Sequence, residues 1–149
     1  MFYAYNGIKD GPMKYFKKLK LFKSSNLTLD PETGKGYSYE WYRIVDRIDG
    51  MVVLNNYSYS PTTCRHISKI RSMLTTLGVR EYLEIEAPGG LQDLDKAIEY
   101  YEGQINELNQ EIAKPRSSKI KNLDRYDSIN KYKDKITLVK ALKEGNRNE

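Results

Sequence analysis

The sequence predicts an α+β fold: a small, mostly antiparallel sheet in the order β-β-α-β with one packed helix, followed by a C-terminal antiparallel two-helix hairpin. Strand-like runs at 37–48 and 51–59 are separated by Asp49-Gly50, a strong signal for a two-residue hairpin turn. Two helix-length segments end the chain, and the first spans 91–113. Both carry apolar residues at alternating steps of three and four, the pattern of paired helices.

The N-terminal third gives mixed signals. Residues 2–5 fit a short edge strand, and the run from Asp10 to Pro12 fits the start of a helix. The basic amphipathic stretch 14–23 could meet phosphates or an anionic membrane surface, but we favour a docked helix whose lysines are solvated. Residues 24–36 read as a loop, because their second half is rich in turn-forming residues.

The turn at Asp49-Gly50 sets the register of the central hairpin, with Ile48 opposite Met51. Strict alternation then divides the side chains between two faces. The predicted core face holds Tyr42, Ile44, Ile48, Met51, Val53 and Tyr57, interrupted by Asp46 and Asn55. The opposite face holds Tyr39, Trp41, Arg43, Val45, Arg47, Val52, Leu54, Asn56 and Ser58.

A helix follows the hairpin. Ser60 and Pro61 fit its N-cap and first turn, and Gly78 fits its end. Its apolar stripe consists of Ile67, Ile70, Met73, Leu74 and Leu77. The next run, 79–86, reads as a third strand, and 87–90 as the joint to the helical hairpin.

The two C-terminal helices carry opposite charges. The acidic side chains of the first are Asp93, Asp95, Glu99, Glu102, Glu107 and Glu111. The basic side chains of the second are Lys119, Lys121, Arg125, Lys131, Lys133, Lys135, Lys140 and Lys143. The apolar seam of this second helix includes Leu123, Tyr126, Ile129, Tyr132, Ile136, Val139 and Leu142. We expect the two helices to pair, so that most of their charge is neutralised within the molecule.

The length of 149 residues suits one compact domain, or a small domain with a helical appendage. We expect residues 1–90 to form the α+β domain and 91–149 to form the arm, packed on that domain or used for oligomerisation. Residues 91–149 carry a net charge of +1 and residues 1–90 a net charge of +4. The basic character that a nucleic acid would meet is therefore modest and lies in the first part.

Composition excludes several classes of site. One cysteine and one histidine cannot form the usual Cys/His zinc site, and one cysteine cannot form a disulfide within the chain. No apolar run approaches the roughly 20 residues of a membrane span, and no signal peptide is evident. We expect a cytoplasmic protein that does not bind membranes and needs no cofactor.

The first candidate site is the outer face of the hairpin. Aromatic rings and guanidinium groups on an exposed sheet suit stacking on unpaired bases and contact with phosphates, in DNA or RNA. The candidate residues are Tyr39, Trp41, Arg43, Arg47 and Asn56, with Arg65 and Lys69 on the next helix. The competing interpretation is simple packing, which we favour because Val45, Val52 and Leu54 make this face apolar enough to need cover.

The second candidate is the run of reactive side chains around His66. Ser60, Thr62, Thr63 and Cys64 beside this histidine suggest a nucleophile and a base. Helical geometry instead places His66 at the rim of the apolar stripe and points Cys64 away from it. We favour a capped helix start, and hence a protein that is not an enzyme.

The third candidate is the arm. A pair of adjacent tyrosines widens its apolar surface, which indicates a second contact, with its own domain or with another chain. The residues concerned are Tyr100, Tyr101, Ile105 and Leu108. The leading hypothesis is thus a small nucleic-acid-associated protein. The alternative is a protein-interaction or inhibitor module of the mobile-element or phage type, or a homodimer, acting through the arm.

Overall fold

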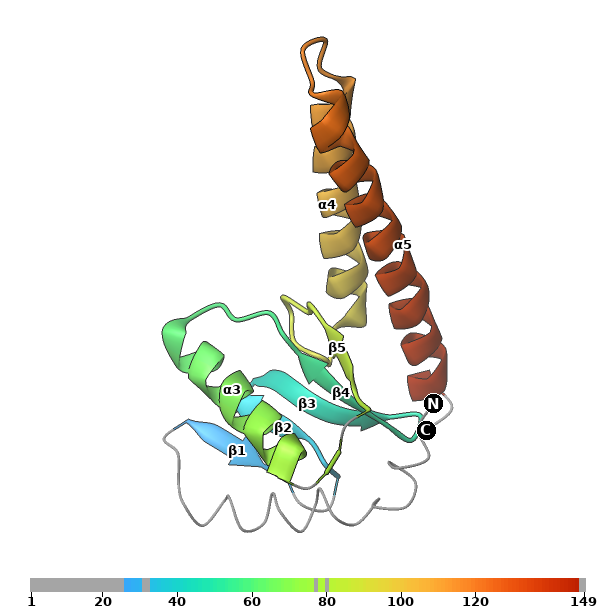
Figure 1. Ribbon diagram of the computed structural model, residues 1–149. Coiled ribbons are helices and arrows are strands. Elements are labelled where there is room, and N and C mark those ends of the chain that lie inside the picture. Colours follow the sequence, from blue (N-terminus) through green and yellow to red (C-terminus); the bar gives the residue numbers. More distant parts are fainter. Residues whose placement is uncertain (1–25, 31–32, 77, 80, 148–149) are drawn as a thin grey trace.

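The computed structural model describes residues 26–30, 33–76, 78–79 and 81–147. These residues form a sheet, one helix on one face of it, and a two-helix arm that leaves the opposite face (Figure 1). The α+β class predicted from the sequence is confirmed. The predicted strand at 2–5 and helix at 14–23 lie outside the described residues.

The sheet has five strands, ordered in space as along the chain. They are β1 (Leu27–Leu29), β2 (Gly36–Ser38), β3 (Tyr42–Ile48), β4 (Met51–Asn55) and β5 (Leu83–Ile85). The first four pair antiparallel, and β5 pairs parallel to β4. The prediction of a loop over 24–36 is wrong, because this segment holds β1 and the first residue of β2.

A turn at 39–41 divides the predicted strand 37–48 into β2 and β3. Tyr39 and Glu40 both adopt left-handed backbone conformations, with φ of 57° and 69°. Ser38 then pairs directly with Tyr42, which closes a tight hairpin. Left-handed backbone is unusual for a non-glycine residue, so neither side chain signals the turn.

The hairpin of β3 and β4 has the predicted register. Ile48 pairs with Met51, and Val45 pairs with Leu54. Asp49 (φ 54°) and Gly50 (φ 76°) form the connecting turn. Positive φ at both central positions matches the right-handed twist of the strands, which is why Asp-Gly is favoured there.

A bulge in β3 changes the predicted faces. Tyr37 of β2 pairs with Arg43, whereas the adjacent Gly36 pairs with Val45, so Ile44 is an extra residue on β3. An extra residue reverses the alternation of all side chains before it. The predicted core face is therefore wrong in part, since Tyr42 and Ile44 do not share a core with Ile48.

The helix α3 (Pro61–Thr76) covers one face of the sheet, in front of the strands in Figure 1. Ser60 caps it by accepting a hydrogen bond from the Thr63 amide at 3.1 Å, and Gly78 (φ 78°) follows its end, as predicted. The core beneath this helix consists of Leu29, Tyr42, Ile44, Val45, Val52, Leu54, Ile67, Ile70, Met73, Leu74 and Val79. The face predicted to carry nucleic-acid contacts is thus largely covered by α3.

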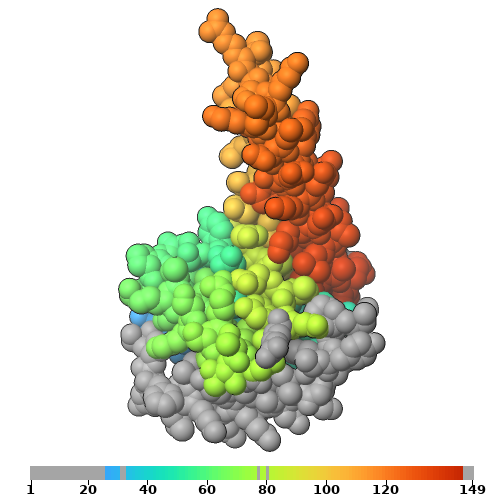
Figure 2. Space-filling view, in the orientation of Figure 1, coloured from blue at the N-terminus to red at the C-terminus, as the bar shows by residue number. Residues whose placement is uncertain are grey.

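The arm consists of α4 (Leu94–Ala113) and α5 (Lys119–Arg147), which pack against each other as the predicted antiparallel hairpin. Its base packs on the other face of the sheet. This second core consists of Ile48, Val53, Ile85, Ala87, Leu91, Leu94, Ala97, Tyr101, Val139 and Leu142. The distal half of the arm projects clear of the other described residues (Figure 2).

Opposite charges meet along the arm. Lys143 pairs with Asp95 near the base, and Arg125 lies 4.0 Å from Glu111 near the loop. Both pairs are partly exposed to solvent, so each contributes little to stability.

The predicted seam of α5 fails in the first turns of the helix. Leu123 and Tyr126 are 66% and 52% exposed, whereas Ile129 is buried. Polar side chains close the tip of the arm instead: Asn122 Nδ2 donates to Ser117 Oγ at 3.0 Å, and Arg125 donates to Asn122 Oδ1 at 2.7 Å. These bonds turn the polar residues inward and leave the apolar ones in solvent.

Candidate nucleic-acid interface

Aromatic side chains gather at one end of the sheet, where the turn between β2 and β3 meets the connection from β4 to α3. This aromatic corner consists of Tyr39, Trp41, Tyr42, Tyr59 and His66. The Trp41 and Tyr59 ring centroids are 5.5 Å apart, and these side chains are 54% and 43% exposed. Tyr42, which is buried, supports Tyr59 edge-on at 4.7 Å. The corner therefore presents two neighbouring rings to solvent on a packed aromatic base.

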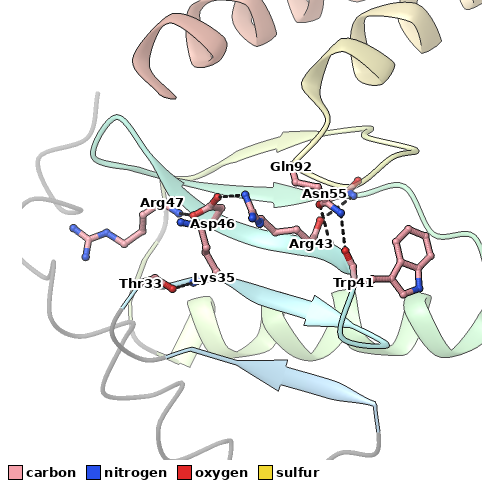
Figure 3. A network of polar contacts seen from close by, with 8 residues as sticks. All are labelled: Thr33, Lys35, Trp41, Arg43, Asp46, Arg47, Asn55 and Gln92. Carbon is pink, nitrogen blue, oxygen red and sulfur yellow. Dashed lines mark hydrogen bonds and ion pairs between the residues drawn. The ribbon is translucent and has the colours of Figure 1, made fainter. Parts of the chain in front are cut away.

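The backbone beneath Trp41 is held from the base of the arm (Figure 3). Gln92 Nε2 donates to the Trp41 carbonyl at 2.6 Å, and Gln92 Oε1 accepts from the Arg43 amide at 3.2 Å. The Leu91 amide also donates to the Arg43 carbonyl at 3.0 Å. A segment distant in sequence thus fixes the strand end from which the indole projects.

Tyr42 anchors the corner to the interior. Its hydroxyl lies 2.5 Å from the Tyr57 carbonyl oxygen and 3.0 Å from that of Ala87. Burial raises the pKa of Tyr42 to about 12, because the interior disfavours the charged phenolate. Asn55 completes this region by donating to the Ala87 carbonyl and accepting from the Ala87 amide, at 2.9 and 3.0 Å.

A buried polar network joins the corner to the start of α3. His66 Nδ1 lies 2.8 Å from Ser38 Oγ, which lies 3.2 Å from Thr63 Oγ1. Ser60 donates to Thr63 at 3.1 Å. Ser38, Thr63 and His66 are all buried. The bonds between Ser60 and Thr63 form the capped helix start that the sequence predicts, and Cys64 is exposed, as expected.

The two arginines predicted on the sheet face, Arg43 and Arg47, do not belong to the aromatic corner. The Trp41 indole and the Arg47 guanidinium point to opposite ends of β3 in Figure 3. The two residues are six positions apart, which is at most about 20 Å of extended chain. Arg43 pairs with Asp46 at 3.2 Å and lies 5.4 Å over the Tyr37 ring. Of the residues on the predicted sheet face, only Tyr39 and Trp41 join the aromatic corner.

The other predicted residues lie on and beside α3. Asn56 Oδ1 accepts from Arg71 at 3.1 Å, and Arg71 also pairs with Glu84 at 2.6 Å. That carboxylate raises the pKa of Arg71. Arg65 and Lys69 are exposed one helical turn apart, and Arg65 directly precedes His66 of the corner.

Sequence reasoning missed Tyr59 and Gln92 as parts of this site. Tyr59 lay at the end of a predicted strand but belongs to the connection before α3. Gln92 lay within a predicted helix but precedes α4, whose N-cap is Asp93. The Asp93 side chain accepts from the Lys96 amide at 3.3 Å, and the preference of Asp for the N-cap position is the signal that could have placed the helix start.

The predicted partner-binding residues of the arm divide into two groups. Tyr101 is fully buried against its own sheet, where its hydroxyl accepts from the Glu86 amide at 2.7 Å and donates to the Glu86 carboxylate. Burial raises the pKa of Tyr101. Because it is buried against its own sheet, Tyr101 is unavailable to another chain. Tyr100, its neighbour, packs edge-on against Tyr57 at 5.5 Å.

Ile105 and Leu108 lie farther along the arm and are half-buried between its helices. Leu108 lines a groove of about 330 Å³ between α4 and α5. The other residues around this groove are Gln104, Glu107, Gln110, Glu111, Ser128 and Tyr132. The lining is mostly polar, so it offers no apolar pocket to a partner.

Among the described residues, no helix combines the length and apolarity that crossing a membrane requires. That same part of the chain brings together no three His, Cys, Asp or Glu side chains able to hold a metal ion. Comparison with known proteins gives no relative: no family model, curated protein or solved structure matches the chain.

Proposed function

We propose that the protein binds single-stranded nucleic acid at the aromatic corner, without catalysing a reaction. Trp41 and Tyr59 stack on unpaired bases, and Arg65 and Lys69 contact the neighbouring phosphates. The observation that carries the proposal is the pair of exposed rings, 5.5 Å apart, on a backbone held by Gln92. Each base stacked on an aromatic side chain contributes about 1–3 kcal/mol to the binding free energy, whichever base it is.

The charges favour a single strand over a duplex. Stacking requires bases that are already unpaired, and among the described residues we take two exposed cations of α3, Arg65 and Lys69, as phosphate contacts. Two phosphate contacts on a single strand give a slope of about −1.4 in a plot of log affinity against log salt. We therefore expect affinity to fall about sevenfold between 50 and 200 mM salt, which is a weak dependence for a nucleic-acid-binding protein.

Titration with fluorescein-labelled 12-nucleotide DNA and RNA strands, single and duplex, tests the proposal. We expect the single strands to bind more tightly than the duplexes and to quench the fluorescence of Trp41, the only tryptophan of the chain. Trp41→Ala is expected to weaken binding by about 5- to 150-fold, the loss of one stacked base. Absence of binding at 50 mM salt would refute the proposal.

Matched variants separate local from general effects. Tyr126→Ala removes an equally exposed aromatic ring from the arm and should leave single-strand binding unchanged. Lys69→Ala should reduce the salt dependence, whereas Lys131→Ala, which removes an exposed lysine from α5, should not. Equal losses in Trp41→Ala and Tyr126→Ala would show that the corner is not the binding site.

The second candidate function is a protein-interaction or inhibitor module, of the type that mobile genetic elements carry, acting through the arm. It is favoured by the large apolar side chains exposed near the tip of α5. Ile120, Leu123 and Tyr126 are 78%, 66% and 52% exposed. Exposed apolar clusters rimmed by polar residues are typical of protein contacts. This function takes first place if the oligonucleotide titrations show no binding.

A further inference from the structure

The first turns of α5 present an unpaired apolar strip, formed by Ile120, Leu123 and Tyr126. Steps of three residues place these side chains within about 120° of one another around the helix, with Leu123 in the middle. Ile120 and Leu123 point away from α4 and Tyr126 lies at the edge of the strip, because Arg125 and Ile129 occupy the side that faces α4. The tip strip is therefore a surface that the arm leaves unused.

We propose that the tip strip is a self-association surface, at which a second copy of the chain docks α5 against α5 in antiparallel orientation. A two-fold axis at Leu123 places Ile120 of each copy opposite Tyr126 of the other. The same operation makes the contact self-complementary, since both copies contribute the same residues.

The charges beside the strip select this arrangement. Lys119 precedes the strip and Asp127 follows it, each about 40° from Leu123 around the helix, and both are exposed. The antiparallel pairing brings each Lys119 level with the Asp127 of the other copy, with Cβ atoms about 6 Å apart at usual helix spacing. A parallel pairing would instead place lysine against lysine and aspartate against aspartate.

The length of the free arm allows the pairing. Twelve residues, or about 18 Å of helix, separate Leu123 from Lys135, whose ammonium group bonds the Glu84 carbonyl of β5. The other copy extends past Leu123 by one helical turn and the loop at 114–118, about 10 Å in all. Two arms can thus overlap at their tips while both sheets stay apart.

Sedimentation equilibrium of the full chain between about 10 and 500 μM tests the proposal. The strip buries less than the roughly 800 Å² per partner of a long-lived complex, so we expect a reversible monomer–dimer equilibrium within this range. Leu123→Glu should weaken the dimer more than about 100-fold, because it places two carboxylates together at the axis. Lys121→Glu, which introduces a carboxylate on the opposite side of the helix, should weaken it by less than about threefold.

A charge exchange tests the orientation. Lys119→Asp and Asp127→Lys should each weaken the dimer by about tenfold, and the double variant should restore it. A chain that stays monomeric at every concentration, or a dimer indifferent to Leu123→Glu, would overturn the proposal. A dimer that the double exchange fails to restore would overturn the antiparallel pairing. Circular dichroism checks the fold of each variant, and oligonucleotide binding at nanomolar protein is a separate measurement, so neither proposal depends on the other.

Discussion

Tyr101 joins the arm to the sheet, and its hydroxyl provides a direct test of that joint. The oxygen accepts from the Glu86 amide at 2.7 Å and donates to the Glu86 carboxylate, while the ring is fully buried. Tyr101→Phe keeps the ring and removes only the oxygen. The amide of Glu86 then loses its acceptor at a partly buried position.

An unsatisfied buried donor costs about 1–3 kcal/mol, and we expect Tyr101→Phe to lower the free energy of unfolding by that amount. For a chain of this size, each kcal/mol lowers Tm by about 2–4 °C. Urea denaturation measures the free energy. Hydrogen exchange measures the joint itself, because the Glu86 amide should exchange faster in the variant than in the parent protein.

Tyr126→Phe is the matched control, because it removes a hydroxyl from the same arm at a position 52% exposed. Its effect should stay within about 0.5 kcal/mol, as for other surface changes. If Tyr101→Phe changed stability no more than this control, with unchanged exchange at Glu86, the hydroxyl would not hold the arm on the sheet.

Three further outcomes follow from the described contacts. The pKa of Tyr42 is about 12 in the folded chain and near 10 in the unfolded chain. The stability that its neutral form contributes is therefore complete below pH 10 and is lost as pH rises toward 12. Urea midpoints measured across this pH range should fall less steeply in Tyr42→Phe than in the parent protein. Gly36→Ala should lower the free energy of unfolding, measured by urea denaturation, by about 1–3 kcal/mol, because the new Cβ would lie 2.6 Å from Val45 and 2.7 Å from Leu29. The control Gly103→Ala should not destabilise the chain, because its Cβ meets no atom within 4 Å. Ser60→Ala should cost about 0.5–2 kcal/mol through loss of the α3 cap, and a thermal scan that showed no shift would contradict the capping role.

Local backbone chemistry made several features predictable. Asp49-Gly50 set the β3–β4 register, and Ser60 and Gly78 set the limits of α3. In each case the side chain, or its absence, favours one backbone conformation. The heptad pattern likewise predicted the pairing of α4 with α5.

The features that sequence reasoning missed depend on contacts between distant residues. Tyr39 and Glu40 form a turn that their own conformational preferences do not favour. Gln92 stabilises this turn by donating a hydrogen bond to the carbonyl of Trp41, the next residue. The extra residue in β3, Ile44, becomes evident only from its pairing with β2. Strand β1 has three residues, which is too short for alternation to be recognised.

The candidate site was likewise predicted only in part from the sequence. Trp41 was predicted to be a contact residue, and it is exposed, but the arginines expected beside it lie elsewhere. One-residue shifts explain the difference, since a bulge or a turn moves a side chain to another face. Tyr59 entered the site because the β4–α3 connection folds back beside the β2–β3 turn.

The length of the distal half of the arm is independent of the two cores. Of the described residues, none between 102 and 131 belongs to either core. Removing seven residues from each helix in this part would preserve the phase of the seam and shorten the arm by about 10 Å. The distance between the aromatic corner and the tip strip can therefore change in steps of one heptad while the sheet and its two cores remain the same.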